Sequence, residues 1–166
     1  MSDIKITYGA STTIGITLTG LATNSLGVLT TGQESNYISN SGNNLDVLLG
    51  GKISVGSSPT ASRQIEIWVY GSIDDSPTYP DALDGSDSSE VILGDRNATM
   101  KLFQVISTDS TSNKTYWFGP SSVSSSFGGY IPKYWGVFVC HNTAVSLNTS
   151  GTSHSISYTP IYESIN

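Results

Sequence analysis

Arg63–Ile73, with the sequence RQIEIWVYGSI, and Tyr134–His141, with the sequence YWGVFVCH, are the two clearest β-strand patterns in the chain. Successive residues of a strand point to opposite faces, so each pattern defines two rows of side chains. In the first strand one row is Ile65, Ile67, Val69 and Ile73, and the other is Glu66, Trp68 and Tyr70. Both rows are largely apolar, which indicates that both faces of this strand are covered.

The second strand repeats this arrangement. One row is Trp135, Val137 and Val139, and the other is Tyr134, Gly136 and Phe138. Antiparallel sheets in single molecules commonly keep one polar face, so the second apolar face of these strands needs a cover. The sequence leaves two covers open: the long loops of the chain itself, or a neighbouring subunit.

Shorter strand patterns flank these two. They lie at residues 4–8, 14–18, 45–55, 100–106, 115–118 and 154–158, the last ending near Pro160. The segments 4–8 and 14–18 suggest an N-terminal hairpin or a pair in facing sheets, and Gly50-Gly51 predicts a bulge, a bend or a tight hairpin. The single expected helical turn is Pro120–Gly129, capped by Ser121 or Ser122 and ended by Gly128.

These patterns predict an all-β protein. About eight to ten short strands, with at most one short helical turn, favour an antiparallel β-sandwich of jelly-roll or Greek-key type. No linker or repeat divides the chain, so we expect one domain over residues 1–166.

Composition excludes several classes of function. The net charge is −6 and the seven basic residues are scattered, which disfavours nucleic-acid binding. No apolar run approaches the ~20 residues of a membrane helix. Cys140 is the single cysteine, so no intrachain disulfide forms, and with no evident signal peptide we expect folding in a reducing cytosol.

The acidic segment 74–95, DDSPTYPDALDGSDSSEVILGD, is the longest expected loop. Asp81, Asp84 and Asp87 are candidate calcium ligands, because calcium prefers several carboxylate oxygens on a flexible loop. An EF-hand register fails, since Ala82 and Val91 stand where ligands are needed. The alternative is a solvated loop whose aspartates stabilise turns.

No catalytic motif stands out. Glu66, Asp81 and Asp84 could supply a glycosidase carboxylate pair, but that chemistry needs a defined separation in a cleft. His141 and His154 fit no metal-ligand spacing, and Cys140 and His141 point to opposite faces of their strand. We therefore expect a protein without enzymatic activity and without a cofactor, apart from the calcium considered above.

Aromatic side chains are the remaining candidates for contacts. As an interface we single out Trp68, Tyr70, Tyr79, Tyr134 and Phe138. Together with Trp117 and Trp135 they could instead stack against sugars or fill a core. An exposed edge on the N-terminal strand could also pair with the sheet of a partner.

Four stretches carry a resemblance to a known class of proteins. They are IEIWVYGSIDDSPTYPDALDG (65–85), FGGYIPKYWGVFVCHNTAVSLN (127–148), LDVLLGGKISV (45–55) and YTPIYESI (158–165). They resemble small virion structural proteins of tailed bacteriophages, and most of all a capsid decoration (cement) protein.

This resemblance implies a partner and a location. Such a protein is made in the host bacterial cytoplasm, binds the outer surface of the major capsid protein lattice and stabilises it, often as a trimer. The resemblance supplies no catalytic residues. The alternative is a receptor- or carbohydrate-binding β-sandwich module of a phage tail fibre or spike.

Overall fold

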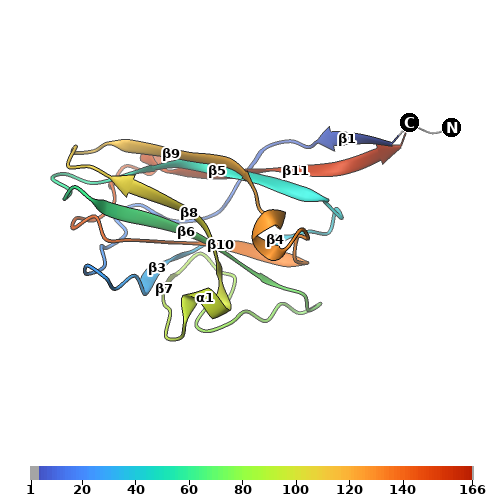
Figure 1. Cartoon of the computed structure of the whole chain (residues 1–166), viewed down its shortest axis with the longest axis horizontal. Coiled ribbons are helices and arrows are strands. Elements are labelled where there is room, and N and C mark those ends of the chain that lie inside the picture. The colour runs from blue at the N-terminus through green and yellow to red at the C-terminus, as the bar shows by residue number, and fades with distance from the viewer. Residues whose placement is uncertain (1–3, 166) are drawn as a thin grey trace.

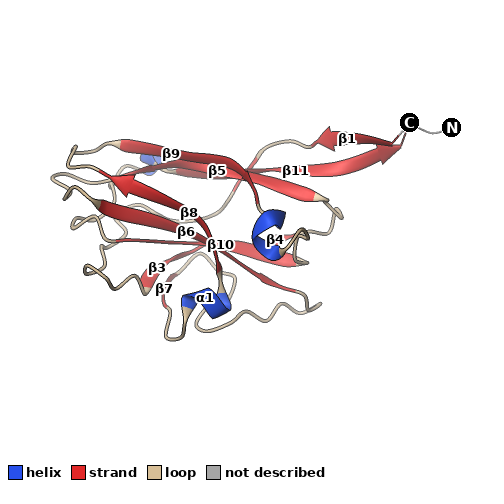
Figure 2. Ribbon diagram, viewed as in Figure 1, coloured by secondary structure: helices blue, strands red, loops and turns tan. Residues whose placement is uncertain are grey.

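Two antiparallel sheets face each other in the computed structural model, which describes residues 4–165 (Figure 1). Sheet I contains β1 (Ile4–Tyr8), β11 (Ser155–Ile165), β5 (Asp46–Ser54) and β9 (Thr115–Ser122), with β2 (Thr12–Thr13) beside β11. Sheet II contains β7 (Ser89–Val91), β3 (Thr31–Glu34), β10 (Tyr134–His141), β6 (Arg63–Ser72) and β8 (Lys101–Thr108), with β4 (Ile38–Ser39) beside β10. The predicted all-β class is confirmed, and Figure 2 shows how little helix there is.

The strands follow the order of a jelly roll. β1 pairs with β11, β3 with β10, β5 with β9 and β6 with β8. Among these eight strands the first pairs with the last, the second with the seventh, and so on inward. This nesting describes one long antiparallel hairpin rolled into two sheets, which is the jelly-roll topology.

The main core lies between the two sheets. Sheet II contributes the predicted rows Ile65, Ile67 and Val69 of β6 and Trp135, Val137 and Val139 of β10, all buried. Sheet I contributes Val47, Leu49, Ile53, Phe118 and Ile156. The alternation of the two strongest strands is therefore confirmed.

A second core lies on the outer face of sheet II. Its sheet residues are Trp68, Tyr70, Phe138 and Cys140, and its cover consists of Leu29, Leu83, Ile92 and Met100. Three of the four covering residues come from the segment between β6 and β8, which Figure 1 shows below the sheet in green to yellow-green. Of the two alternatives for the second apolar face, the structure shows the cover made by the chain's own loops.

Several local predictions are wrong. Ile73 does not continue the aliphatic row, because β6 ends at Ser72 and Ile73 is exposed. The segment 14–18 is not a strand, although Ile14 and Leu18 are buried in the main core. It lies alongside the sheets and makes single backbone hydrogen bonds, such as Ile14 N to Ile156 O at 2.8 Å.

The N-terminal strand has a different partner from the one expected. β1 pairs with the end of β11, with Tyr8 opposite Ile161 and Ile4 opposite Ile165. β11 continues past Pro160, with β5 on one edge and β2 and then β1 on the other. Pro160 O accepts from Gly9 N, so Pro160 faces the second edge, between the β2 pairing at Tyr158 and the β1 pairing from Ile161. The N–H that proline lacks therefore points away from β5 and into this gap, so no ladder hydrogen bond is lost.

The helical elements are short. The expected turn forms as the 3-10 helix η1 (Ser124–Phe127) and ends at Gly128 with a φ of 78°. Its N-cap position is Val123, and Ser122 contributes by accepting a hydrogen bond from Ser125 N at 3.1 Å. The sequence did not predict η2 (Gly151–Ser153) or α1 (Arg96–Thr99), which Asp95 caps. Within residues 4–165 no helix is long and apolar enough to cross a membrane.

Candidate functional site

The five aromatic residues expected at an interface divide into two groups. Trp68, Tyr70 and Phe138 lie inside the second core and are at most 4% exposed. A partner reaches them only if the cover opens, so their burial is explained within one chain. Tyr79 and Tyr134 keep partial exposure, and these two stay candidates for contact with a partner.

Edge-to-face aromatic pairs fix the two partly exposed tyrosines. The Tyr79 ring lies 5.2 Å from the Tyr70 ring, and the Tyr134 ring lies 5.5 Å from the Tyr37 ring. Burial raises the pKa of Tyr79 to about 12, so its phenol stays protonated at neutral pH. The contact with Tyr70 ties the acidic loop to sheet II and favours a structural role for Tyr79.

A polar network crosses the second core. Glu66 Oε2 accepts hydrogen bonds from Arg96 Nη1 at 2.7 Å and from Trp68 Nε1 at 2.9 Å. Gln64 Nε2 donates to Glu66 Oε1 at 2.6 Å. The Arg96 guanidinium also lies over the Trp68 ring, 4.8 Å from its centroid. Because all of these donors converge on Glu66, it anchors α1 to sheet II rather than serving as one half of an open carboxylate pair.

The three candidate calcium ligands bind backbone and side-chain donors of the chain itself. Asp81 accepts from Leu93 N at 3.0 Å and Gly94 N at 2.6 Å, and Asp84 accepts from Ser86 N at 2.8 Å. Within residues 4–165, no three acidic, histidine or cysteine side chains gather as a metal ion would require.

Asp87 accepts more hydrogen bonds than Asp81 or Asp84. Its carboxylate accepts from Thr17 N at 2.8 Å, from Thr17 Oγ1 at 2.6 Å and from Gln33 Nε2 at 2.6 Å. The aspartates of the loop thus accept hydrogen bonds that stabilise turns and attach the loop to the rest of the chain, as the alternative to calcium binding describes, and calcium binding itself stays an untested prediction.

A buried glutamate of β3, Glu34, also binds the acidic loop. Glu34 is fully buried and accepts from Gly85 N at 2.7 Å and Asp84 N at 3.1 Å. Burial is the largest influence and raises the pKa of Glu34 above its usual range, although these hydrogen bonds oppose the shift. The loop is therefore attached to sheet II by directed hydrogen bonds as well as by apolar packing.

Cys140 and His141 have structural surroundings. Burial raises the pKa of the Cys140 thiol to about 12, so it is not a thiolate nucleophile at neutral pH. His141 is buried, with Nδ1 3.0 Å from Thr143 Oγ1 and Nε2 3.0 Å from Leu21 O. Burial lowers its pKa to about 4, so its imidazole is neutral and links β10 to the 14–30 segment.

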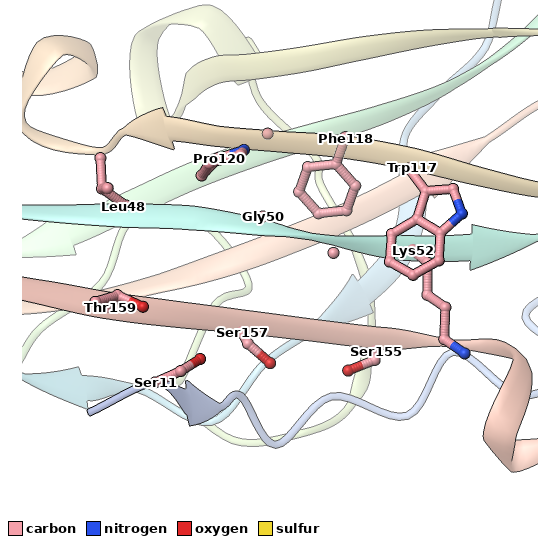
Figure 3. Close-up of a pocket in the computed structure, with 12 residues that line it drawn as sticks. Ser11, Leu48, Gly50, Lys52, Trp117, Phe118, Pro120, Ser155, Ser157 and Thr159 are labelled. Atoms are coloured by element: carbon pink, nitrogen blue, oxygen red, sulfur yellow. The ribbon is translucent and has the colours of Figure 1, made fainter. Parts of the chain in front are cut away.

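The outer face of sheet I carries a hollow of about 530 Å³ (Figure 3). Its first row runs across three strands, because Trp117 of β9 is paired with Lys52 of β5 and Lys52 with Ser155 of β11. Directly paired residues of antiparallel strands share a face, so these three side chains stand together. The Lys52 ammonium lies 5.9 Å from the centroid of the Trp117 ring.

Glycines form the floor of this hollow. β5 runs unbroken through the glycine pair, so the tight hairpin is wrong. An irregularity does occur there: Leu49 pairs with Ser121 and Gly51 with Phe118, so the extra residue lies on β9, where Gly119 and Pro120 face Gly50. A Cβ at Gly50 would lie 3.1 Å from Phe118 O, and one at Gly51 would collide with Ser155 O. The close approach of the strands therefore requires glycine, and leaves the floor without side chains.

A two-stranded ribbon extends from the other end of sheet I. Figure 1 shows β1 and the end of β11 running beyond the sandwich. Beyond Ile161, β11 is paired with β1 alone. On one face of this ribbon Ile4, Ile6 and Tyr8 are 68%, 67% and 63% exposed. The ribbon thus presents an apolar stripe that neither core covers.

The two exposed features were only partly foreseen. Trp117 was one of several possible sugar platforms, but nothing local distinguished it from Trp68 or Trp135, which are buried. Lys52 was not singled out, because its position beside Trp117 depends on the pairing of β5 with β9. The alternation of Ile4, Ile6 and Tyr8 is visible in the sequence and by itself predicts a half-buried strand, but these three side chains are exposed.

Comparison of the chain with protein-family models, curated proteins and solved structures found no match. The phage resemblance therefore stands on the quoted sequence motifs alone.

Proposed function

We propose that this protein is a non-enzymatic structural protein of a tailed-phage virion, and specifically a capsid decoration protein. It binds the outer surface of the major capsid protein lattice and stabilises it, as a homo-oligomer for which a trimer is the expected state. Many weak contacts repeated over a lattice give avidity without chemistry. The jelly roll is compatible with this role by analogy, since viral capsid proteins use it.

The observation that carries the proposal is the apolar stripe of the β1–β11 ribbon. An isolated two-stranded ribbon is marginally stable in water, and here Ile4, Ile6 and Tyr8 remain exposed on it. A contact that covers these side chains would stabilise the ribbon and bury apolar area at the same time. The ribbon is therefore the element best suited to dock on a capsid or on a second copy.

Replacement of Ile4, Ile6 and Tyr8 by serine tests this role. Purified protein is mixed with capsids of the encoding phage that lack it, and bound protein is measured by co-sedimentation. If each side chain contributes about 1 kcal/mol on burial, the triple variant should bind roughly a hundredfold more weakly.

The matched control replaces Ile73 and Leu93, which are at least as exposed but lie outside the ribbon. We expect the control to bind as the wild type does, and both variants to keep the wild-type circular dichroism. Light scattering on the free and bound protein determines the oligomeric state. Wild-type binding by the serine variant would contradict a docking role of the ribbon, and a wild-type protein that ignores capsids would contradict the proposed function.

A further inference from the structure

We propose that the hollow on the outer face of sheet I binds an acidic saccharide, with a sugar ring on Trp117 and the ligand carboxylate at Lys52. This inference is independent of capsid docking. The volume of the hollow, about 530 Å³, lies within the ~300–1,000 Å³ of small-ligand sites. Sugars of one to a few rings match this size.

Trp117 supplies the platform. It is 74% exposed, while Trp68 and Trp135 are buried in the two cores. A large indole face in water is unfavourable, and it packs well against the C–H face of a pyranose ring. In Figure 3 the Trp117 ring stands at one end of the hollow, beside the Lys52 side chain.

Lys52 provides the selection for negative charge. It is the one charged residue among the residues of the described chain that line the hollow. The protein as a whole has a net charge of −6, so this local cation is an exception on an acidic molecule. A single ammonium matches one carboxylate, whereas phosphate-rich ligands normally meet several cations or a cluster of backbone N–H groups.

Hydroxyl groups line the side of the hollow opposite Trp117. Ser11, Ser155 and Thr159 make no side-chain hydrogen bond to any other residue of the range 4–165, although Ser157 donates weakly to Thr13 at 3.4 Å. Serine and threonine hydroxyls both donate and accept, as sugar hydroxyls do. The floor of Gly50 and Gly51 lets a flat ring approach the backbone closely.

The combination therefore has three elements of a saccharide site. One apolar face orients the ring, unoccupied hydroxyls match its polar edge, and one cation matches an acidic substituent. Uronic acids and sialic acids are sugars with this chemistry.

A panel of paired glycans tests the inference on the full chain. Each acidic oligosaccharide, containing glucuronate, galacturonate or sialate, is matched with its neutral counterpart of the same ring count. Binding is measured by equilibrium titration of tryptophan fluorescence and by glycan array. Because Trp68 and Trp135 are buried, we expect the emission change on binding to come from Trp117.

We expect at least one acidic glycan to bind about tenfold more tightly than its neutral counterpart, as a charge-assisted hydrogen bond implies. Trp117→Ala should weaken binding of both members of that pair about tenfold or more, and Trp117→Phe should retain part of it. Lys52→Met should remove most of the preference for the acidic member while leaving the neutral one unchanged.

Two matched controls lie outside the hollow. Tyr130→Ala removes another strongly exposed aromatic, and Lys101→Met removes another exposed lysine, and both should bind as the wild type does. Circular dichroism confirms that each variant is folded. The inference is overturned if no acidic glycan in the panel outbinds its neutral counterpart, if Trp117→Ala binds normally, or if Lys52→Met keeps the preference.

Discussion

Removing the Arg96 side chain tests whether the polar network of the second core stabilises the fold. The Arg96 and Glu66 side chains are 21% and 9% exposed, and their charged groups are 2.7 Å apart. Arg96→Met keeps much of the aliphatic stem but removes the cation. The Glu66 carboxylate then stays under the 73–100 cover with the Trp68 and Gln64 donors and a weak hydrogen bond from the Cys140 thiol at 3.8 Å.

The expected loss is about 2–3 kcal/mol of unfolding free energy. Removing one partner of a fully buried ion pair destabilises by about 3–5 kcal/mol. Arg96 is partly solvated and Glu66 keeps two hydrogen bonds, which reduces that figure. Loss of the cation–π contact with Trp68 contributes about 0.5–1 kcal/mol of the total.

Urea denaturation followed by tryptophan fluorescence measures this loss. With an m-value of about 2 kcal/mol/M, the midpoint of Arg96→Met should fall by about 1–1.5 M. In the double variant Glu66→Gln/Arg96→Met neither member of the ion pair keeps its charge, so the two substitutions should couple by about 1–2 kcal/mol.

An exposed ion pair provides the control. Lys114 and Asp109 are paired at the surface, so Lys114→Met should change stability by no more than about 0.5 kcal/mol. A loss below about 0.5 kcal/mol for Arg96→Met, or strict additivity in the double variant, would refute the view that the network holds α1 and its loop against sheet II.

Three further predictions follow from single sites. Burial lowers the pKa of His141 to about 4 from 6.5, so the unfolded state binds more protons between these values. The free energy of unfolding should therefore fall by about 3 kcal/mol as the pH falls from 6.5 to 4. Urea titrations at several pH values measure this dependence, and His141→Gln should flatten it. An unchanged pH dependence in His141→Gln would contradict the assignment to His141. Gly51→Ala should lower the melting temperature by about 6 °C, because the new Cβ would collide with the Ser155 carbonyl oxygen. In the control Gly42→Ala, the new Cβ would meet only the Asn44 side chain, and the melting temperature should change little. Because Asp81, Asp84 and Asp87 already accept hydrogen bonds, about 1 mM calcium should leave the melting temperature within about 1 °C, and a rise of several degrees would instead support calcium binding.

The sequence predicted what depends on local alternation. Period-two patterns in β6 and β10 assigned Ile67 and Val139 to one face and Trp68 and Phe138 to the other, as observed. The same patterns required a cover for the second face. They could not identify its residues, because Leu29, Ile92 and Met100 come from separate segments of the chain, and only the folded chain brings them together.

Long-range pairing accounts for most of what was missed. The pairing of β1 with the end of β11 joins residues near opposite ends of the sequence, and no local signal specifies it. The hollow also depends on register, since Trp117, Lys52 and Ser155 become neighbours only when β9, β5 and β11 pair in this alignment. Cross-strand neighbours of this kind are invisible to a reading of each strand alone.

Because the chain itself covers the second core, the exposed features best suited to contact a partner lie on sheet I. Trp68, Tyr70 and Phe138 were the apolar surplus that suggested assembly, and the chain's own cover accounts for them. Trp117 beside the hollow and the stripe of Ile4, Ile6 and Tyr8 have no such cover among residues 4–165. Both lie on sheet I, so substitutions there should alter binding with little change in stability, whereas substitutions at Trp68 or Phe138 should lower stability and affect binding only through unfolding.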